Sequence, residues 1–164
     1  MESPLRLAAL SSLCTLLRLL PERDPHSNLF ELTMFFLGFL DDDSVWPTLM
    51  VRWDVALLQE LGFGLDLSEC AATGNNDNLV FVSPKSGRAV SAAAGERYAD
   101  RLLRLPQFLV EGRNAIVQPQ DIIDGLSLVG YFLEKHVFGP KGESLPEARS
   151  RMVELVKRNI DSLD

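Results

Sequence analysis

Apolar residues recur at helical spacing from the beginning of the chain. Ser3 and Pro4 fit the cap and the first position of a helix, and Pro21 ends the apolar stripe that follows them. This stripe consists of Leu5, Ala9, Leu13, Leu16 and Leu20. Residues 29–40 are apolar at nearly every position, so they predict a second helix that is enclosed by the others.

Polar breaks divide the rest of the chain into further helices and one pair of strands. Helices are predicted over 46–62, 91–103 and 118–137, and a last helix begins at Ser144. The apolar run 79–82, followed by a Ser-Pro-Lys-Ser-Gly turn, is typical of a β-hairpin. The pattern therefore predicts an all-α helical bundle with a short β-hairpin insertion.

Composition places this bundle in a reducing compartment. The 164 residues suffice for one domain with its own core. Cys14 and Cys70 stand in unlike contexts and form no disulfide framework, which favours the cytoplasm. Glu2 and Arg18 argue against a secretory signal, and 29–40 is too short to span a bilayer, so no membrane contact is expected.

Charge is distributed unevenly over a net value of −7. Residues 1–84 contribute −8 and residues 85–164 contribute +1. Because DNA phosphates attract clustered cations, any contact with DNA is expected in the second part of the chain. The candidate residues there are Lys85, Arg88, Arg97, Arg101 and Arg104.

These cations support two interpretations of equal weight. Arg97, Arg101 and Arg104 recur at i, i+4 and i+7, so one face of the predicted helix would form a track for the DNA backbone. Alternatively they form a solvated face on which Glu96 and Asp100 are their partners. A catalytic function is not predicted, because no base is placed to activate a nucleophile.

Residues 68–95 have the layout of a small metal-binding knuckle without its ligands. Cys70 and Thr73 are three positions apart, and so are Ser91 and Ala94 beyond the hairpin. One thiolate cannot hold zinc, which needs about four nitrogen or sulfur ligands. His26 and His136 lack a suitable spacing to Cys70, so no metal and no other cofactor is expected.

Four phrases, in this order along the chain, resemble the bacterial recombination mediator family RecO. They are RWDVALLQELGFGLDLSEC (52–70), NLVFVSPKSGRAVS (78–91), LSLVGYFLEKHVF (126–138) and LPEAR (145–149). The second and the last two look especially like the alphaproteobacterial branch. The resemblance covers essentially all of residues 1–164, which would correspond to the C-terminal helical domain of the family.

The resemblance implies a fold and a set of partners. Family members begin with an OB-fold, which nothing before residue 78 resembles, so we expect a shortened chain or a late reading-frame start, with Met1 not the biological start. Many members hold zinc between two C-x-x-C pairs, and here three of the four ligands are replaced. The implied function is DNA binding and annealing in repair and recombination, and RecA loading with RecR, in the bacterial cytoplasm at the nucleoid.

The family's helical domain also receives the acidic, apolar C-terminal tail of single-stranded DNA-binding protein. Arg149 lies beside the apolar row of the last helix, next to Val153, so at the rim of a groove it would clamp a tail carboxylate. An internal salt bridge of Arg149 is the second and slightly favoured interpretation. A structural or adaptor domain without DNA contact is the alternative to the mediator function as a whole.

Overall fold

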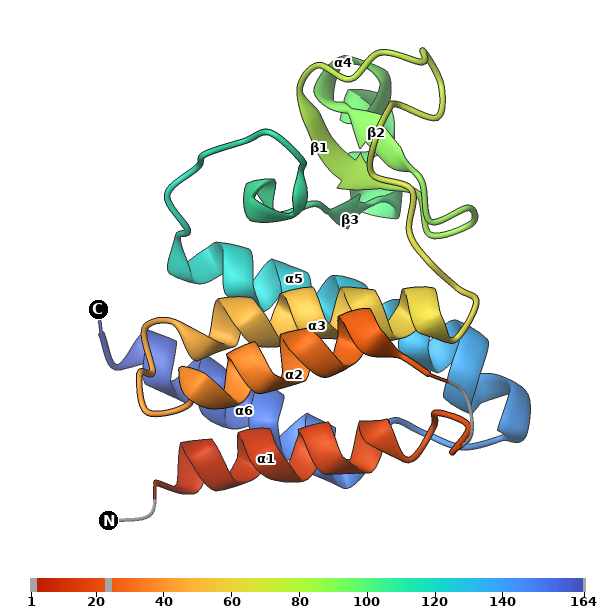
Figure 1. The fold of residues 1–164 in the computed structure, drawn as a ribbon. Coiled ribbons are helices and arrows are strands. Elements are labelled where there is room, and N and C mark those ends of the chain that lie inside the picture. Colours follow the sequence, from red (N-terminus) through yellow and green to blue (C-terminus); the bar gives the residue numbers. More distant parts are fainter. Residues whose placement is uncertain (1–2, 23–24, 164) are drawn as a thin grey trace.

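The fold is a helical bundle that carries a small sheet at one side (Figure 1). The computed structural model describes residues 3–22 and 25–163, so the predictions concerning Met1 and Glu2 lie outside the described residues. The α-helices are α1 (Pro4–Leu17), α2 (Ser27–Gly38), α3 (Trp46–Glu60), α4 (Ala92–Gly95), α5 (Pro119–Leu133) and α6 (Glu147–Asp161). The strands are β1 (Leu79–Val82), β2 (Ala89–Ser91) and β3 (Leu103–Arg104).

Several helices begin and end where the sequence predicts. Proline stands in the first turn of α1, α3 and α5, where its missing N–H costs nothing. At the start of α5 the Asp121 carboxylate accepts a hydrogen bond of 2.8 Å from the Gln118 N–H. Gly62 follows α3 with a φ of +90°, and this left-handed turn lets the Phe63 N–H donate back to the Leu58 carbonyl.

The core lies between α3, α5 and the helices on either side of them. Trp46 and Trp53 on α3 are fully buried, and Phe36 on α2 meets the Trp46 ring edge-on at 6.1 Å. Gly125 on α5 allows a close approach, because a Cβ atom there would lie 2.7 Å from a methyl group of Val51. None of the described helices is both long enough and apolar enough to cross a bilayer.

The prediction that α2 is enclosed by other helices is wrong. It packs mainly on α3, and its fully buried side chains are Leu29 and Phe36. Thr33 accepts a hydrogen bond of 2.8 Å from the Trp53 indole and fixes the helix on this side. The opposite side exposes large apolar residues because no described element covers it. They are Phe30, Met34, Phe35, Leu37 and Phe39.

The predicted hairpin is present, but it belongs to a sheet of three antiparallel strands in the order β2-β1-β3. The prediction of a helix over 91–103 is therefore wrong in its second half. Ser91 caps α4 as expected, since its hydroxyl accepts from the Ala94 N–H. A 3₁₀ turn follows over Glu96–Arg101, and the chain then extends to pair β3 with β1. Pairing with a distant strand satisfies the backbone groups that a longer helix would have satisfied.

A buried ion pair joins the three helices α3, α5 and α6. An Nη atom of Arg149 on α6 lies 2.7 Å from a carboxylate oxygen of Asp54 on α3, and the two side chains are 1% and 0% exposed. The other Nη donates to the Leu126 carbonyl of α5 at 3.2 Å. Burial raises the pKa of the Asp54 carboxyl, and the adjacent guanidinium opposes this shift.

Removal of Arg149 alone is expected to destabilise the fold strongly. Arg149→Met leaves the Asp54 carboxylate buried without its partner, which costs about 3–5 kcal/mol. The double variant Asp54→Leu/Arg149→Met removes both charges and is expected to be more stable than the single variant. Urea unfolding followed by circular dichroism measures both effects.

Arg151→Met, on an exposed face of the same helix, serves as the control and is expected to change stability by less than about 0.5 kcal/mol. If Arg149→Met were as stable as this control, the buried pair would not hold the three helices together.

Candidate partner-binding and nucleic-acid-binding sites

The four knuckle positions lie together at the base of the hairpin. Cys70 is fully buried, and its sulfur accepts a hydrogen bond of 3.3 Å from the Ser91 N–H. The Ser91 hydroxyl in turn accepts a hydrogen bond from the Ala94 N–H. The Thr73 side chain donates to the Cys70 sulfur. Hydrogen bonds thus connect Cys70, Thr73, Ser91 and Ala94 directly to one another.

The Cys70 thiol is unusually acidic as a result. Burial alone would raise its pKa, but hydrogen bonds from Thr73, Ser91 and Ala72 outweigh this effect and lower the pKa to about 6. Among the described residues, no three side chains of His, Cys, Asp or Glu lie close enough together to hold a metal ion. The loss of zinc from this site therefore remains a prediction that fits the donor set.

The apolar side chains of the hairpin are buried. They are Leu79, Phe81, Val82, Ala89 and Val90. Gly95 lies directly on the Phe81 ring, because a Cβ atom at this position would come within 2.6 Å of it. The Lys135 ammonium donates a hydrogen bond of 2.6 Å to the Pro84 carbonyl and so connects the turn of the hairpin to the end of α5.

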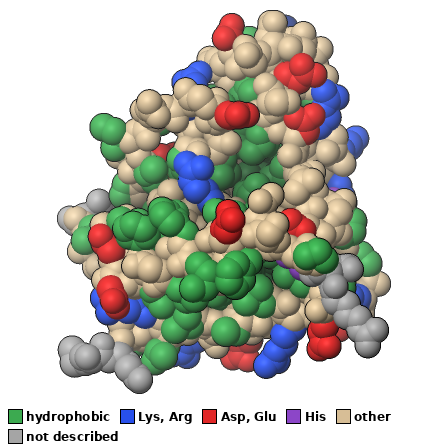
Figure 2. Space-filling model, viewed as in Figure 1, with side chains coloured by type: hydrophobic (Ala, Val, Ile, Leu, Met, Phe, Trp, Pro, Cys, Tyr) green, Lys and Arg blue, Asp and Glu red, His purple; other side chains and the backbone are tan. Residues whose placement is uncertain are grey.

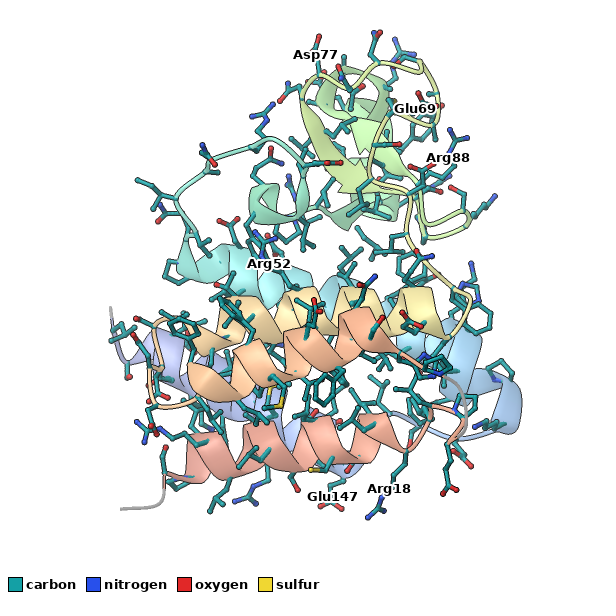
Figure 3. All side chains as sticks on the ribbon, viewed as in Figure 1. Arg18, Arg52, Glu69, Asp77, Arg88 and Glu147 are labelled. Atoms are coloured by element: carbon teal, nitrogen blue, oxygen red, sulfur yellow. The ribbon has the colours of Figure 1, made fainter. Side chains whose placement is uncertain are left out.

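Two of the candidate DNA-binding cations already have partners within the domain. The Arg88 guanidinium lies 3.6 Å from Glu69 and 3.9 Å from Asp66, and the group stands at the exposed edge of the sheet (Figure 3). Arg104 on β3 places its guanidinium over the Phe81 ring at 5.2 Å. These contacts orient both side chains but leave them partly exposed.

The remaining candidates do not form the helical track that was one of the two interpretations. Arg97 and Arg101 are exposed on the 3₁₀ turn, whereas Arg104 belongs to a strand, so the three do not share a helical face. Lys85 is exposed at the tip of the hairpin. No ion pair of Arg97 or Arg101 with Glu96 or Asp100 is present in the described part of the chain.

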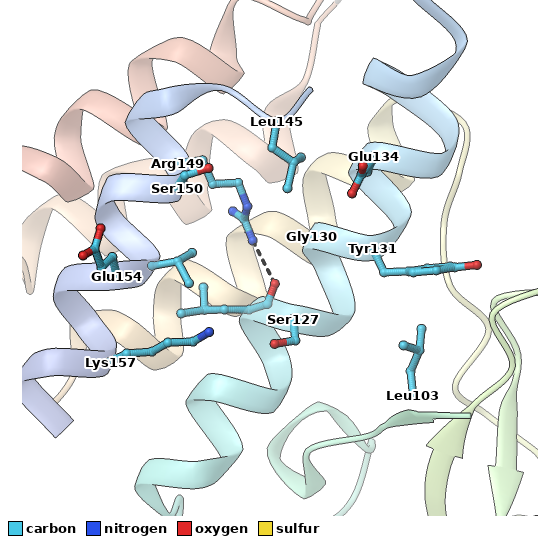
Figure 4. Close-up of a pocket in the computed structure, with 12 residues that line it drawn as sticks. Leu103, Ser127, Gly130, Tyr131, Glu134, Leu145, Arg149, Ser150, Glu154 and Lys157 are labelled. Carbon is cyan, nitrogen blue, oxygen red and sulfur yellow. Dashed lines mark hydrogen bonds between the residues drawn. The ribbon is translucent and has the colours of Figure 1, made fainter. Parts of the chain in front are cut away.

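A groove of about 530 Å³ lies between α5 and α6 and reaches β3 (Figure 4). Its apolar lining consists of Leu103, Leu126, Leu145 and Val153. Ser127, Tyr131 and Lys157 add polar groups, and Glu134 and Glu154 lie at its borders. Glu154 is held by Arg158, one turn further along α6, at 2.5 Å. The groove therefore combines apolar walls with one accessible ammonium group.

Arg149 lies at the floor of this groove, not at its rim. Its guanidinium is 1% exposed and already binds the Asp54 carboxylate, so the predicted rim position is wrong and the internal salt bridge is the arrangement found. Lys157 is a cation of this groove that the sequence analysis did not single out. Its spacing of one turn from Val153 is the signal that could have placed it at the groove.

His136, considered above only as an unsuitable metal ligand, lies among aromatic rings in the structure. Its ring stacks on Phe63 with centroids 4.8 Å apart and lies 6.0 Å from Phe132. A π-helical turn over Glu134–Phe138 produces this position after α5. Phe63, which follows Gly62, thereby fixes the end of α3 against the end of α5.

Comparison with known proteins identifies the family of this chain. A family model described as "Recombination protein O C terminal" matches residues 1–145. The chain belongs to the RecO family. It is 53% identical over 160 residues to a DNA repair protein RecO of Methylorubrum extorquens, and the match covers 94% of this chain and 65% of the relative.

Two further RecO proteins have a similar sequence identity to this chain and a similar coverage. The DNA repair protein RecO of Rhodospirillum centenum is 50% identical over 161 residues, which cover 96% of this chain and 63% of the relative. That of Bartonella quintana is 47% identical over 157 residues, with 96% and 65% covered. The chain thus spans about two thirds of the length of these relatives, and no solved structure matches it.

The acidic thiol predicts a pH dependence of stability. The pKa of Cys70 is lowered from 9.0 to about 6 on folding, so between these values the unfolded state binds more protons than the folded state. Stability is therefore expected to rise from pH 6 to pH 9, and Cys70→Ser should lose this rise while costing about 1 kcal/mol at pH 6. The urea concentration at the midpoint of unfolding, compared for wild type and variant at pH 6 and pH 9, measures both effects.

Cys14→Ser is the control, because Cys14 is an exposed thiol on α1 and should leave the pH dependence as in the wild type. Elemental analysis of the purified protein is expected to find no zinc. Near-stoichiometric zinc, or an unchanged pH dependence in Cys70→Ser, would contradict this account of the knuckle.

Proposed function

We propose that this chain is the helical, partner-docking part of a RecO-type recombination mediator in DNA repair. The observation that carries the proposal is the family match over residues 1–145, together with relatives that are DNA repair proteins. In such a mediator the whole protein binds and anneals DNA and, with RecR, assists the loading of RecA onto strands coated by single-stranded DNA-binding protein. None of the relatives' names denotes a catalytic activity.

The groove between α5 and α6 is the proposed receptor for the tail of single-stranded DNA-binding protein. A phenylalanine side chain fits a groove of this size whose walls are apolar, beside Val153 and Leu145. The tail's carboxylates would then meet the Lys157 ammonium at the border. Arg149 supports this site from below, because its pairing with Asp54 fixes α6 against α3.

A weaker contact with DNA is proposed for the sheet side of the domain. Lys85, Arg97 and Arg101 are exposed there, while Arg88 and Arg104 are oriented by their internal partners. The net charge of −7 opposes the approach of DNA at long range, so these cations alone bind phosphates weakly. An adaptor domain with no DNA contact is the alternative, and the acidic first half of the chain favours it.

Tail binding can be tested by calorimetric titration of an acidic peptide ending in phenylalanine. Val153→Asp places a charge in the apolar wall and Lys157→Glu reverses the bordering cation, so each is expected to weaken binding about tenfold or more. Arg151→Glu makes the same charge reversal outside the groove and should have little effect. Equal affinity in all three variants would exclude this groove as the receptor.

DNA binding can be tested by electrophoretic shift with single-stranded DNA at low and high salt. We expect weak binding whose affinity falls steeply with salt, because phosphate contacts release counterions. The double reversal Arg97→Glu/Arg101→Glu should abolish it, while Arg151→Glu leaves it unchanged. Nanomolar binding at physiological salt would contradict the weak contact, and absence of any shift at low salt would favour the adaptor alternative.

A further inference from the structure

The exposed side of α2 is an apolar surface that the preceding sites do not use. Phe30 is 65% exposed and Phe35 is 55% exposed, and Met34, Leu37 and Phe39 extend the surface along the helix. Figure 2 shows these hydrophobic side chains gathered over α2, with little blue among them. Contiguous apolar surface of this kind on a folded domain marks a contact site for another molecule.

A shallow groove runs beside this apolar surface. It lies between α2 and α3, has a volume of about 530 Å³, and is lined by Asn28, Glu31, Leu32, Phe35 and Ala56. Glu31, Phe35 and Phe39 follow one another at intervals of four residues and therefore form a row along α2. The Phe35 and Phe39 rings are 5.0 Å apart, so the row is a carboxylate followed by an aromatic pair.

Glu31 is the polar group that indicates the chemistry of the occupant. Within the described residues its carboxylate has neither an ion pair nor a hydrogen bond, although it borders an apolar groove. An arginine from a partner could lay its guanidinium over the Phe35 ring and bind the Glu31 carboxylate with two parallel hydrogen bonds.

The surrounding charges select among possible occupants. Of the six carboxylates in residues 25–60, Asp54 pairs with Arg149, Asp41 and Asp43 pair with Arg6, and Glu60 pairs with His26. Glu31 is the only charged side chain on α2, and the one Lys or Arg of this stretch, Arg52, donates to the Phe108 carbonyl at 2.8 Å. A second copy of the chain would bring another helix without cations against Glu31, and an anionic lipid surface or a nucleic acid would be repelled by the net charge of −7. A cationic partner is attracted both by the Glu31 carboxylate and by this net charge.

We propose that α2 and the groove beside it dock a basic amphipathic helix of another protein, with an aliphatic ridge on the apolar row and an arginine at Glu31. The twelve residues of α2 offer about 18 Å of length, enough for three turns of a partner helix. This site is distinct from the groove between α5 and α6, which takes an acidic ligand.

The test uses a labelled fourteen-residue peptide with leucines at helical spacing and arginines beside them, followed by fluorescence anisotropy at physiological salt. Its matched control has glutamates in place of the arginines. The wild-type chain is expected to bind the basic peptide and not the acidic one. Phe35→Ser and Glu31→Arg are each expected to weaken binding about tenfold.

Two further variants separate docking from general attraction. Glu147→Arg makes the same charge reversal on α6, and Ile116→Ser removes an exposed apolar side chain elsewhere, so both should bind like the wild type. Circular dichroism confirms that each variant is folded. If the two controls lose affinity as much as Glu31→Arg and Phe35→Ser, the attraction is unspecific and the proposal fails.

Two other occupants are tested in the same series. Sedimentation that shows a dimer in the wild type and a monomer in Phe35→Ser would assign the face to a second copy and overturn the proposal. The basic peptide should also bind the longer RecO of Methylorubrum extorquens. If it binds this chain but not that protein, the additional part of the longer chain covers the face, and the proposal is likewise overturned.

Discussion

The pairing of Asp54 with Arg149 is the constraint on which the arrangement of the bundle depends. It joins α3 to α6 across 95 residues of sequence, and the second arm of the guanidinium reaches the backbone of α5. One Asp54 oxygen has no partner among the described residues, so the pair is not optimised for stability alone. A buried pair of this kind tolerates few alternative packings, because every shift of a helix would leave a charge unpaired.

Both the groove floor and the knuckle are held by internal hydrogen bonds. At the knuckle, the Cys70 sulfur is surrounded by hydrogen-bond donors, and these donors lower the pKa of its thiol to about 6. The apolar residues of β1 and β2 are buried beside it. A domain of this size can bury enough apolar surface to be stable without a metal.

Much of the helical architecture could be predicted from the sequence, because prolines, caps and apolar spacing are local signals. The start of α5 at Pro119 and the end of α3 at Gly62 are examples. The third strand could not be predicted, since Leu103 and Arg104 become a strand only by pairing with β1. The same limit applies to Arg149, because periodicity shows where an arginine lies on a helix but not that an aspartate of another helix faces it.

The apolar character of α2 shows a related limit. Periodicity indicates that a helix is apolar, whereas the structure decides whether its own chain covers it. The two surfaces proposed for partners differ in charge, since Lys157 borders one and Glu31 borders the other. Their spatial separation follows the division of the sequence into an acidic first part and a nearly neutral second part. Ligands of opposite charge would therefore not compete for one site.

Helix α3 connects these two surfaces through neighbouring residues. The Trp53 indole donates to Thr33 and holds α2 in place, and the next residue, Asp54, holds α6 through Arg149. Successive residues of a helix point about 100° apart, so one turn of α3 can support two separate faces of the bundle. Any rotation of α3 would move α2 and α6 together. The geometry of each docking surface is thus set by the same few buried polar contacts, and neither surface can change independently of the core between them.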